Sequence, residues 1–295
     1  MATYNILRTC VSAVAAVAIV TSTAFAAGTV DYSVGVVTGF GAGVAPPTAI
    51  SPAHAKLLAR EAAIAMAQRD LAATINGVQV DAETTVENMM TTSSVVRTRI
   101  SGLLRGAKIV EERYEDGACY VTMEIPIFGP SNSLASTVIE RHSTVERFPE
   151  PIKTIEPSIP NVDVRVSISG TPIQPPTVQP KQPNAAYGNF TGLIVDCRGL
   201  GLKSVMSPVI KNANGTPIYG YKNLNYDKII SEGMAQYAED FDEATRAGMN
   251  PIVVKAVSLD NHNGNPVISV ADANRILIEN EISGFLDDCN VVFIK

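Results

Sequence analysis

The sequence has no excess of basic residues: 23 Lys and Arg stand against 29 Asp and Glu, which gives a net charge of −6. Proteins that bind nucleic acid need clustered Lys and Arg. This mild acidity favours solubility and argues against a nucleic-acid partner.

The chain also lacks any apolar run of the ~20 residues that a transmembrane helix needs. Residues 11–20 form a short apolar run behind Arg8, the only charge in residues 1–26. Ala24-Phe25-Ala26 follows, with the small-x-small pattern that signal peptidase cuts. We therefore expect residues 1–26 to be a cleaved export signal, with an uncleaved anchor as the alternative. The mature chain then has no transmembrane segment.

A lipid anchor is not expected either, because Cys10 precedes the short apolar run instead of following it. The predicted location is therefore the periplasm or the outside of the cell. Association with the outer membrane without a lipid anchor stays open.

Recognisable chemistry is scarce as well. The three histidines, His54, His142 and His262, are scattered, and no Ser lies in a nucleophile-elbow pattern. The cysteine spacing has no metal pattern. We expect a protein that is not an enzyme, with no catalytic residue, metal or cofactor, although distant residues can still converge in a fold.

Three cysteines remain after cleavage, and an odd number in an oxidising compartment suggests one bridge and one free thiol. Cys119 alternates with apolar residues and is expected to face a core. Cys197 and Cys289 are therefore the candidate disulfide. Cys197 follows one apolar strand and Cys289 precedes another, so they can meet only if the strands run antiparallel or a loop folds back.

Residues 27–128 predict a β-α-α-β-β domain. A Val- and Thr-rich strand spans 29–40, and Ser51-Pro52 begins an amphipathic helix that ends near Asn76-Gly77. Leu57, Ile64 and Leu71 recur along this helix at seven-residue spacing. Its many alanines would let a partner surface approach closely.

The second helix of this domain begins at a capping box, Thr84 to Glu87, and ends at Gly106. Residues 91–96 are poor helix formers, so the helix should be weak or bent there. A hairpin of 108–114 and 118–127 follows, because Asp116-Gly117 suits a type I′ turn.

Residues 129–187 predict a Pro-rich linker. Half of the 18 prolines lie between Pro149 and Pro183, and such a stretch cannot sustain a helix or a central strand. We expect a semi-rigid connector, with a short edge strand possible at 162–169 and one or two helical turns at 131–141.

Residues 188–295 predict a small α/β domain with a mixed sheet, so the whole chain is of the α+β class. Strands are expected at 191–195, 252–259 and 291–294, helices at 226–240 and from Ser269 onward, and a hairpin at Asn214-Gly215. Loops at strand ends often bind ligands. The candidate ligand loops carry these residues: Asp196, Arg198, Lys203, Asp260 and Asn263.

The segment from Ala55 to Met90, followed by the hairpin, resembles the lipoprotein-20 family of bacterial surface antigens. It is also similar to the N-terminal domain of flagellar assembly protein T. The likeness lies in the Ala- and Arg-rich first helix, Gly77-Val78, the helix start at Thr84 and the terminal hairpin. It implies a compact domain, an envelope location and self-assembly or assembly around a larger machine, and no catalytic residues.

The sequence thus favours a non-catalytic exported envelope protein that acts in structural assembly, docking or oligomerisation. Its expected partners are a second copy of itself or other envelope proteins. The alternative is a periplasmic protein that binds or hydrolyses a small ligand with its C-terminal domain.

Overall fold

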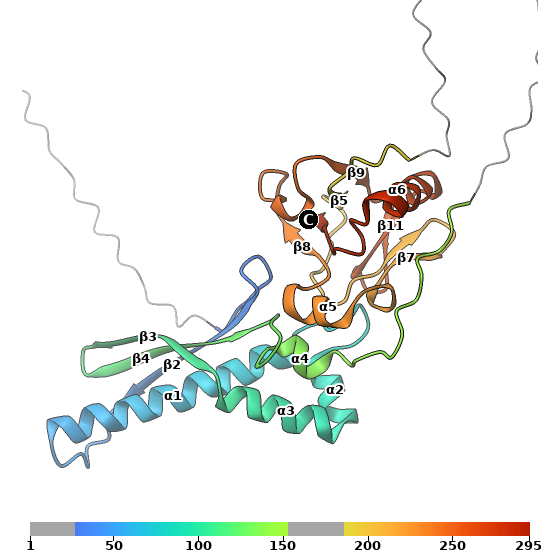
Figure 1. The fold of residues 1–295 in the computed structure, drawn as a ribbon. Coiled ribbons are helices and arrows are strands. Elements are labelled where there is room, and N and C mark those ends of the chain that lie inside the picture. The colour runs from blue at the N-terminus through green and yellow to red at the C-terminus, as the bar shows by residue number, and fades with distance from the viewer. Residues whose placement is uncertain (1–26, 153–185) are drawn as a thin grey trace, which may run out of the picture.

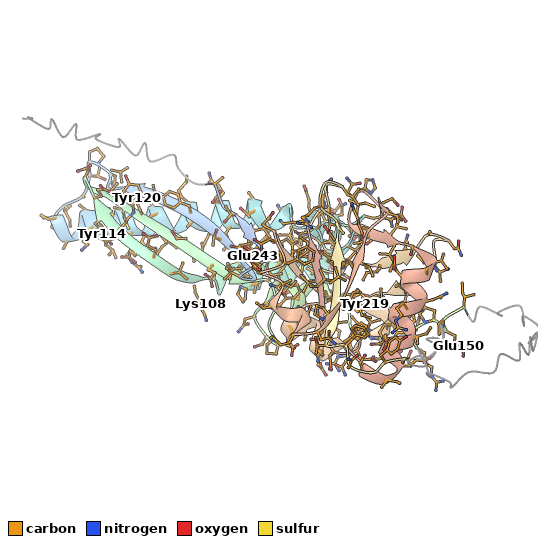
Figure 2. The ribbon with its side chains drawn as sticks, turned by 90° about the horizontal axis from the view of Figure 1, so that it is seen from above. Lys108, Tyr114, Tyr120, Glu150, Tyr219 and Glu243 are labelled. Carbon is orange, nitrogen blue, oxygen red and sulfur yellow. The ribbon has the colours of Figure 1, made fainter. Side chains whose placement is uncertain are left out.

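The computed structural model describes residues 27–152 and 186–295, and it has the predicted α+β fold. An N-terminal sheet with one long helix projects from a C-terminal part built on two further sheets (Figure 1). Seen from above, Tyr114 and Tyr120 lie at the far end of the N-terminal sheet, away from Tyr219 in the C-terminal part (Figure 2).

The N-terminal sheet is antiparallel and has the order β1-β2-β4-β3. Its strands are β1 (Val30–Asp31), β2 (Val36–Val44), β3 (Lys108–Glu115) and β4 (Ala118–Pro126). The helix α1 (Pro52–Asn76) lies along one face of this sheet (Figure 1). Ser51 caps it by accepting a hydrogen bond from the His54 N–H, as the Ser-Pro start predicts.

The buried face of α1 is only partly the predicted one. Leu71 is buried and Ile64 packs against the core, but Leu57 is 55% exposed, because α1 turns a stripe rich in alanine toward β2. Gly41 of β2 explains this: a Cβ on it would lie 2.0 Å from the carbonyl oxygen of Ala63. The alanines therefore serve a close approach within the chain. The buried stripe comprises Ala59, Ala63, Ala67, Leu71 and Ile75.

The predicted strand 29–40 is in fact two strands joined by a turn. The Asp31 carboxylate accepts hydrogen bonds from the N–H groups of Ser33 and Val34, and Gly35 has a φ of 78°. This local side-chain pairing competes with the strand and ends β1. Beyond the turn, β2 continues through its glycines to Val44.

The second predicted helix is also divided, at the position that the sequence marked as weak. The helices α2 (Val86–Thr92) and α3 (Ser94–Arg105) are separated by Ser93, which has extended dihedral angles. The cap of α2 is Thr85, which accepts from the Asn88 N–H, so the predicted box at Thr84 was one residue early.

The hairpin that follows is confirmed. Asp116 and Gly117 have φ values of 50° and 81°, as a type I′ turn requires.

The C-terminal part contains a fully parallel sheet of order β8-β12-β5-β9. Its strands are β5 (Gly192–Asp196), β8 (Gln236–Ala238), β9 (Pro251–Lys255) and β12 (Val291–Ile294). The predicted mixed sheet is a separate one, of order β10-β11-β6-β7. It consists of β6 (Ile210–Asn212), β7 (Pro217–Tyr219), β10 (Ser258–Asp260) and β11 (Asn265–Ile268).

Two main helices accompany these sheets, α5 (Tyr226–Glu232) and α6 (Val270–Ser283). The helix predicted for 226–240 stops early, because Gly233 adopts a φ of 78° and the chain continues into β8. Two short 3-10 turns, η1 (Tyr221–Asn223) and η2 (Thr245–Ala247), complete the part.

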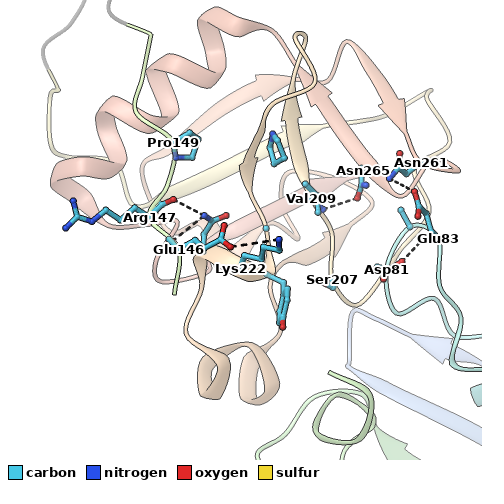
Figure 3. Close-up of a pocket in the computed structure, with 15 residues that line it drawn as sticks. Asp81, Glu83, Glu146, Arg147, Pro149, Ser207, Val209, Lys222, Asn261 and Asn265 are labelled. Carbon is cyan, nitrogen blue, oxygen red and sulfur yellow. Dashed lines mark hydrogen bonds and ion pairs between the residues drawn. The ribbon is translucent and has the colours of Figure 1, made fainter. Parts of the chain in front are cut away.

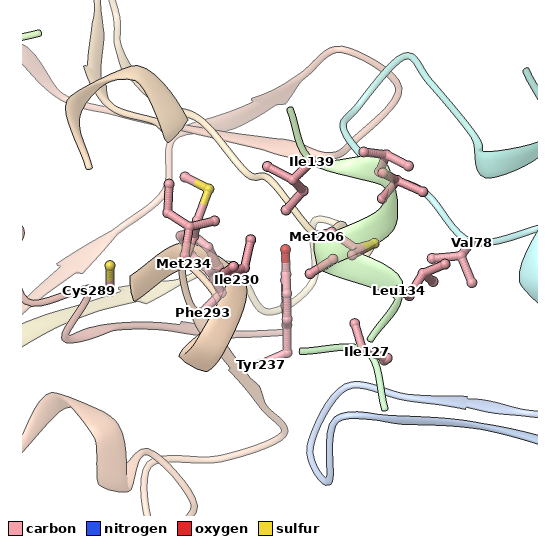
Figure 4. Packing of buried hydrophobic residues seen from close by; sticks show 14 of the residues in the cluster. Val78, Ile127, Leu134, Ile139, Met206, Ile230, Met234, Tyr237, Cys289 and Phe293 are labelled. Atoms are coloured by element: carbon pink, nitrogen blue, oxygen red, sulfur yellow. The ribbon is translucent and has the colours of Figure 1, made fainter. Parts of the chain in front are cut away.

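The predicted linker does not begin at residue 129. The helix α4 (Leu134–Val138) buries Leu134 and Val138 in a core that both parts share (Figure 4). The chain then follows the C-terminal part, where the rings of Phe148 and Tyr219 stack with centroids 6.5 Å apart. Residues 129–148 contain a single proline, Pro130, and their apolar side chains join the core. The remaining predicted connector, with its edge strand at 162–169, lies outside the described residues.

The two parts are joined by backbone hydrogen bonds as well as by the shared hydrophobic core. Met206 and Ser207 donate their N–H groups to the carbonyls of Gln79 and Val80, at 3.1 and 2.8 Å. Tyr32, in the turn after β1, packs edge-on against Tyr237 of β8.

Candidate functional site

A cavity of about 580 Å³ lies where the two parts meet (Figure 3). Its walls come from the turn 81–83, the segment 146–149 and the loops around the mixed sheet. Charged and amide side chains dominate its rim. Those that the following paragraphs use are Glu83, Glu146, Lys222, Asn261 and Asn265.

Most polar groups of this cavity already have partners within the chain. Asn261 donates from Nδ2 to Glu83 Oε1 at 3.0 Å, and Asn265 Oδ1 accepts from the Val209 N–H at 3.0 Å. Lys222 Nζ lies 3.9 Å from Glu146 Oε1. The arrangement stabilises the junction of the two parts and leaves both charge signs at its rim.

The two predicted ligand loops do meet, but the N-terminal part covers their junction. The Lys203 N–H donates to the carbonyl of Asn263 at 2.9 Å. Gly264 of the same loop lies so close to Ala82 that an added Cβ would stand 2.7 Å from the Ala82 Cβ. Asn263 and its two predecessors have positive φ, which shapes the loop to fit against residues 79–84.

The predicted carboxylates, Asp196 and Asp260, are both paired with cations. Arg198 donates from Nε and Nη2 to Asp196, at 2.9 and 2.7 Å, and this hydrogen bonding lowers the pKa of the Asp196 carboxyl. Asp260 pairs with Lys211 at 2.6 Å, which lowers its pKa likewise. A carboxyl whose pKa is lowered stays ionised and is a poor proton donor.

The candidate disulfide is wrong, because β5 and β12 run parallel. Cys197 follows the carboxyl end of β5, whereas Cys289 precedes the amino end of β12. At about 3.3 Å per residue the two ends are roughly 20 Å apart, far beyond the ~6.8 Å limit for bridged Cα atoms. Both thiols are free and buried, as is Cys119, and burial raises the pKa of Cys197 to about 12.

Within residues 27–152 and 186–295, no three His, Cys, Asp or Glu side chains are placed to hold a metal ion. In the same residues no helix combines the length and apolarity needed to cross a membrane.

Sequence reasoning missed one border of the N-terminal sheet. We call the outward-facing backbone of Ala42 and Val44 the β2 edge. Since β1 pairs only at residues 36 and 37 of β2, the strand beyond Phe40 has no neighbour on this side among the described residues. A largely apolar groove of about 690 Å³ runs beside it. Strand β2 lines it with Phe40, Ala42 and Val44, and α1 lines it with Met66, Arg69, Asp70 and Ala73.

The opposite border of the sheet, the β3 edge, is built differently. The strand β3 is bulged between Ile109 and Glu111, and charged residues make up most of it. Arg60 of α1 pairs with Glu112 at 3.0 Å, and Lys56 lies over the Tyr114 ring at 4.2 Å. Bulges and charges are the devices by which proteins prevent edge pairing.

Known families match the N-terminal and the C-terminal part separately. Residues 38–125 match the LPP20 lipoprotein family, and residues 192–295 match the second domain of Tp0624 from Treponema pallidum. The predicted lipoprotein-20 resemblance is thereby confirmed, and the flagellar one stays a prediction. No curated protein matches the chain. The lipoprotein family match supports an exported, envelope-associated bacterial protein.

Proposed function

We propose that the protein is a non-catalytic docking component of the bacterial envelope, on its periplasmic or outer side. The β2 edge is its docking surface. The observation that carries the proposal is the backbone of Ala42 and Val44, which has no strand neighbour among the described residues and lies beside a largely apolar groove. An open edge accepts an extended strand from a partner through main-chain hydrogen bonds.

The condition of the ionisable groups supports a non-catalytic role. The described thiols are buried, and burial raises the pKa values of Cys197 and Cys289 away from the range in which a thiolate forms. Asp196 and Asp260 are ionised and paired. Groups of this kind stabilise a fold and offer neither a nucleophile nor a proton donor.

Photo-cross-linking in cells tests the docking role. A photoreactive residue at Val44, which is 69% exposed, should capture an envelope protein or a second copy of the chain. The matched control places the same residue at Val110 on the β3 edge, which is 53% exposed. Equal capture at both positions, or none at Val44, would contradict the proposal.

The cavity between the two parts favours a second candidate function, the binding of a small zwitterion. Lys222 could receive a carboxylate, while Glu83 and Glu146 could receive an ammonium group. A panel of dipeptides should then raise the unfolding temperature, and Lys222→Ala should remove the rise. No shift with any dipeptide would leave the cavity as a structural junction.

A further inference from the structure

We infer that one exposed face of the N-terminal part is a membrane-docking surface, which contacts the anionic phosphate headgroups of a lipid bilayer in the envelope. We call it the α3 face, and it comprises the outer side of α3 and the start of β3. Its four cations are Arg97, Arg99, Arg105 and Lys108. The inference goes beyond the docking role of the β2 edge and does not depend on it, since it requires only the envelope location that the lipoprotein family match supports.

The charge of this segment is opposite to that of the whole chain. The sequence has 23 Lys and Arg against 29 Asp and Glu, yet the residues between Glu87 and Glu111 include four cations and no acidic residue. A surface with one sign of charge attracts partners of the other sign. The α3 face is therefore a place where an otherwise acidic protein can meet an anionic surface.

The four cations are exposed, and their charges are not neutralised within the part of the chain that the structure describes. Arg99, Arg105 and Lys108 form no ion pair there, although Lys108 lies opposite Glu124 in the register of β3 and β4. Arg97 donates from Nη2 to a backbone carbonyl, an uncharged group, at 2.7 Å. All four charges are thus available to an outside anion.

The outward side of α3 carries small polar residues between its arginines. Val96, Ile100 and Leu103 are buried, and helical spacing places the residues of the opposite side toward solvent. Thr98 and Ser101 donate their hydroxyls to carbonyls one turn earlier, so these side chains lie back along the helix. Figure 1 shows α3 on the side of the N-terminal part that faces away from the parallel sheet. A flat surface can therefore approach α3 closely.

A fluid lipid surface fits the α3 face better than an acidic protein does. Helical spacing sets Arg97 and Arg99 on the two flanks of α3, with Arg105 between them at the outer centre. A protein interface draws most of its binding energy from buried anchors in pockets, and none of these arginines lines the cavities described above. Mobile headgroups can gather around cations that point in different directions. Val95, 56% exposed at the start of α3, can enter the headgroup region beside them.

The net charge of the whole chain makes this contact short-ranged and oriented. Acidic residues elsewhere repel an anionic bilayer, and screening at physiological salt limits attraction and repulsion alike to ~8 Å. Only an approach with the α3 face foremost brings the cations within that range and keeps most carboxylates outside it. Each cation near the surface strengthens attachment about fivefold, so four of them support reversible binding.

Co-sedimentation with lipid vesicles tests the inference. At low salt the exported chain, purified after signal cleavage, should bind vesicles of equal parts phosphatidylglycerol and phosphatidylcholine and should not bind vesicles of phosphatidylcholine alone. Raising the salt to ~0.5 M should release it, because the Debye length then falls to about 4 Å. The double variant Arg99→Gln and Arg105→Gln should bind about tenfold or more weakly.

The matched control removes the same charge from the C-terminal part. Lys203→Gln with Lys255→Gln alters two exposed cations there and should leave vesicle binding unchanged. Circular dichroism shows whether both double variants keep the fold. Equal losses of binding in the two double variants would overturn the inference, since the whole charge of the chain would then decide attachment.

A fluorescent probe gives a second readout, which reports the face that meets the bilayer. An environment-sensitive dye attached at Val95→Cys should shift its emission when vesicles bind. The same dye at Val257→Cys, in the C-terminal part, should not, although Val257 is 57% exposed. The described native thiols are buried and should not take up the dye. A shift at Val257 alone would place the contact elsewhere and overturn the inference.

The remaining outcomes separate a lipid partner from an acidic protein. Absence of vesicle binding at low salt overturns the inference, and so does binding to polyglutamate without binding to vesicles, which would favour an acidic protein partner. None of these results bears on the β2 edge, because photo-cross-linking at Val44 reports that docking role separately.

Discussion

The two borders of the N-terminal sheet differ in almost every property that governs strand pairing. The β3 edge is bulged, charged and bound to α1 through Arg60 and Lys56. The β2 edge has no bulge and no charged side chain, and it borders a largely apolar groove. Natural sheets protect borders that must stay free. Under the proposed docking role, the contrast means that the β3 edge is kept from partners while the β2 edge receives one.

The largest effect on stability should come from disrupting the packing of α1 against β2, because this packing supports the whole N-terminal sheet with both of its borders. In Gly41→Val the new side chain would meet the Ala63 carbonyl, so we expect a loss of about 3 kcal/mol or more in unfolding free energy. Urea denaturation measures it.

Gly102→Ala is the matched control for this experiment. An added Cβ there meets nothing within 4 Å, and the position lies inside α3. We expect a gain of about 0.5–1 kcal/mol, because alanine favours helix. A tolerated Gly41→Val would contradict the close approach of α1.

A charge on the β2 edge should weaken association, whereas the same charge on the β3 edge should not. Val44→Asp introduces a carboxylate where a partner strand would pair, and it should weaken association by about tenfold or more, since each unpaired buried charge costs more than about 1.4 kcal/mol. Val110→Asp on the β3 edge should change nothing. Sedimentation equilibrium of both variants compares them directly, and equal losses would erase the distinction between the borders.

Removing charges from the protected border should make it resemble the open one. We expect the double variant Glu111→Val and Arg113→Val to form larger, concentration-dependent assemblies, because both borders could then pair. The bulge at Val110 remains, so the effect should be smaller than that of Val44→Asp. Light scattering detects such assemblies, and an unchanged particle size would show that these charges do not prevent strand pairing at the β3 edge.

The smallest effect is expected far from both borders, at Asp196. Hydrogen bonding from Arg198 lowers its pKa in the folded chain, so its contribution is present above the unfolded pKa and is lost as pH falls through the folded value. Asp196→Asn should therefore be slightly less stable than the native chain near pH 7 and equal to it in strong acid. A difference that persists in acid would point to packing instead.

Local features of the fold were predictable from the sequence because neighbouring residues determine them. Asp116-Gly117 adopts the predicted turn, Ser51 caps α1, and the weak segment 91–96 contains the break at Ser93. Cys119 faces the core as its alternation with apolar residues indicated.

Features that depend on distant residues were not predictable. The buried stripe of α1 is decided by glycines on β2, so the apolar spacing misled at Leu57, which is exposed. The proposed disulfide failed because only the structure gives the parallel direction of β12 beside β5. The open border escaped notice for the same reason: strand order decides which strand lies at a border.

Amide hydrogen exchange of the exported chain, measured with and without the partner that photo-cross-linking at Val44 captures, tests the central claim most directly. We expect the Ala42 and Val44 amides to slow at least about tenfold when the partner is present, while the outward Glu112 and Tyr114 amides exchange alike in both samples. Unchanged exchange at Ala42 and Val44, or equal slowing at both borders, would contradict it.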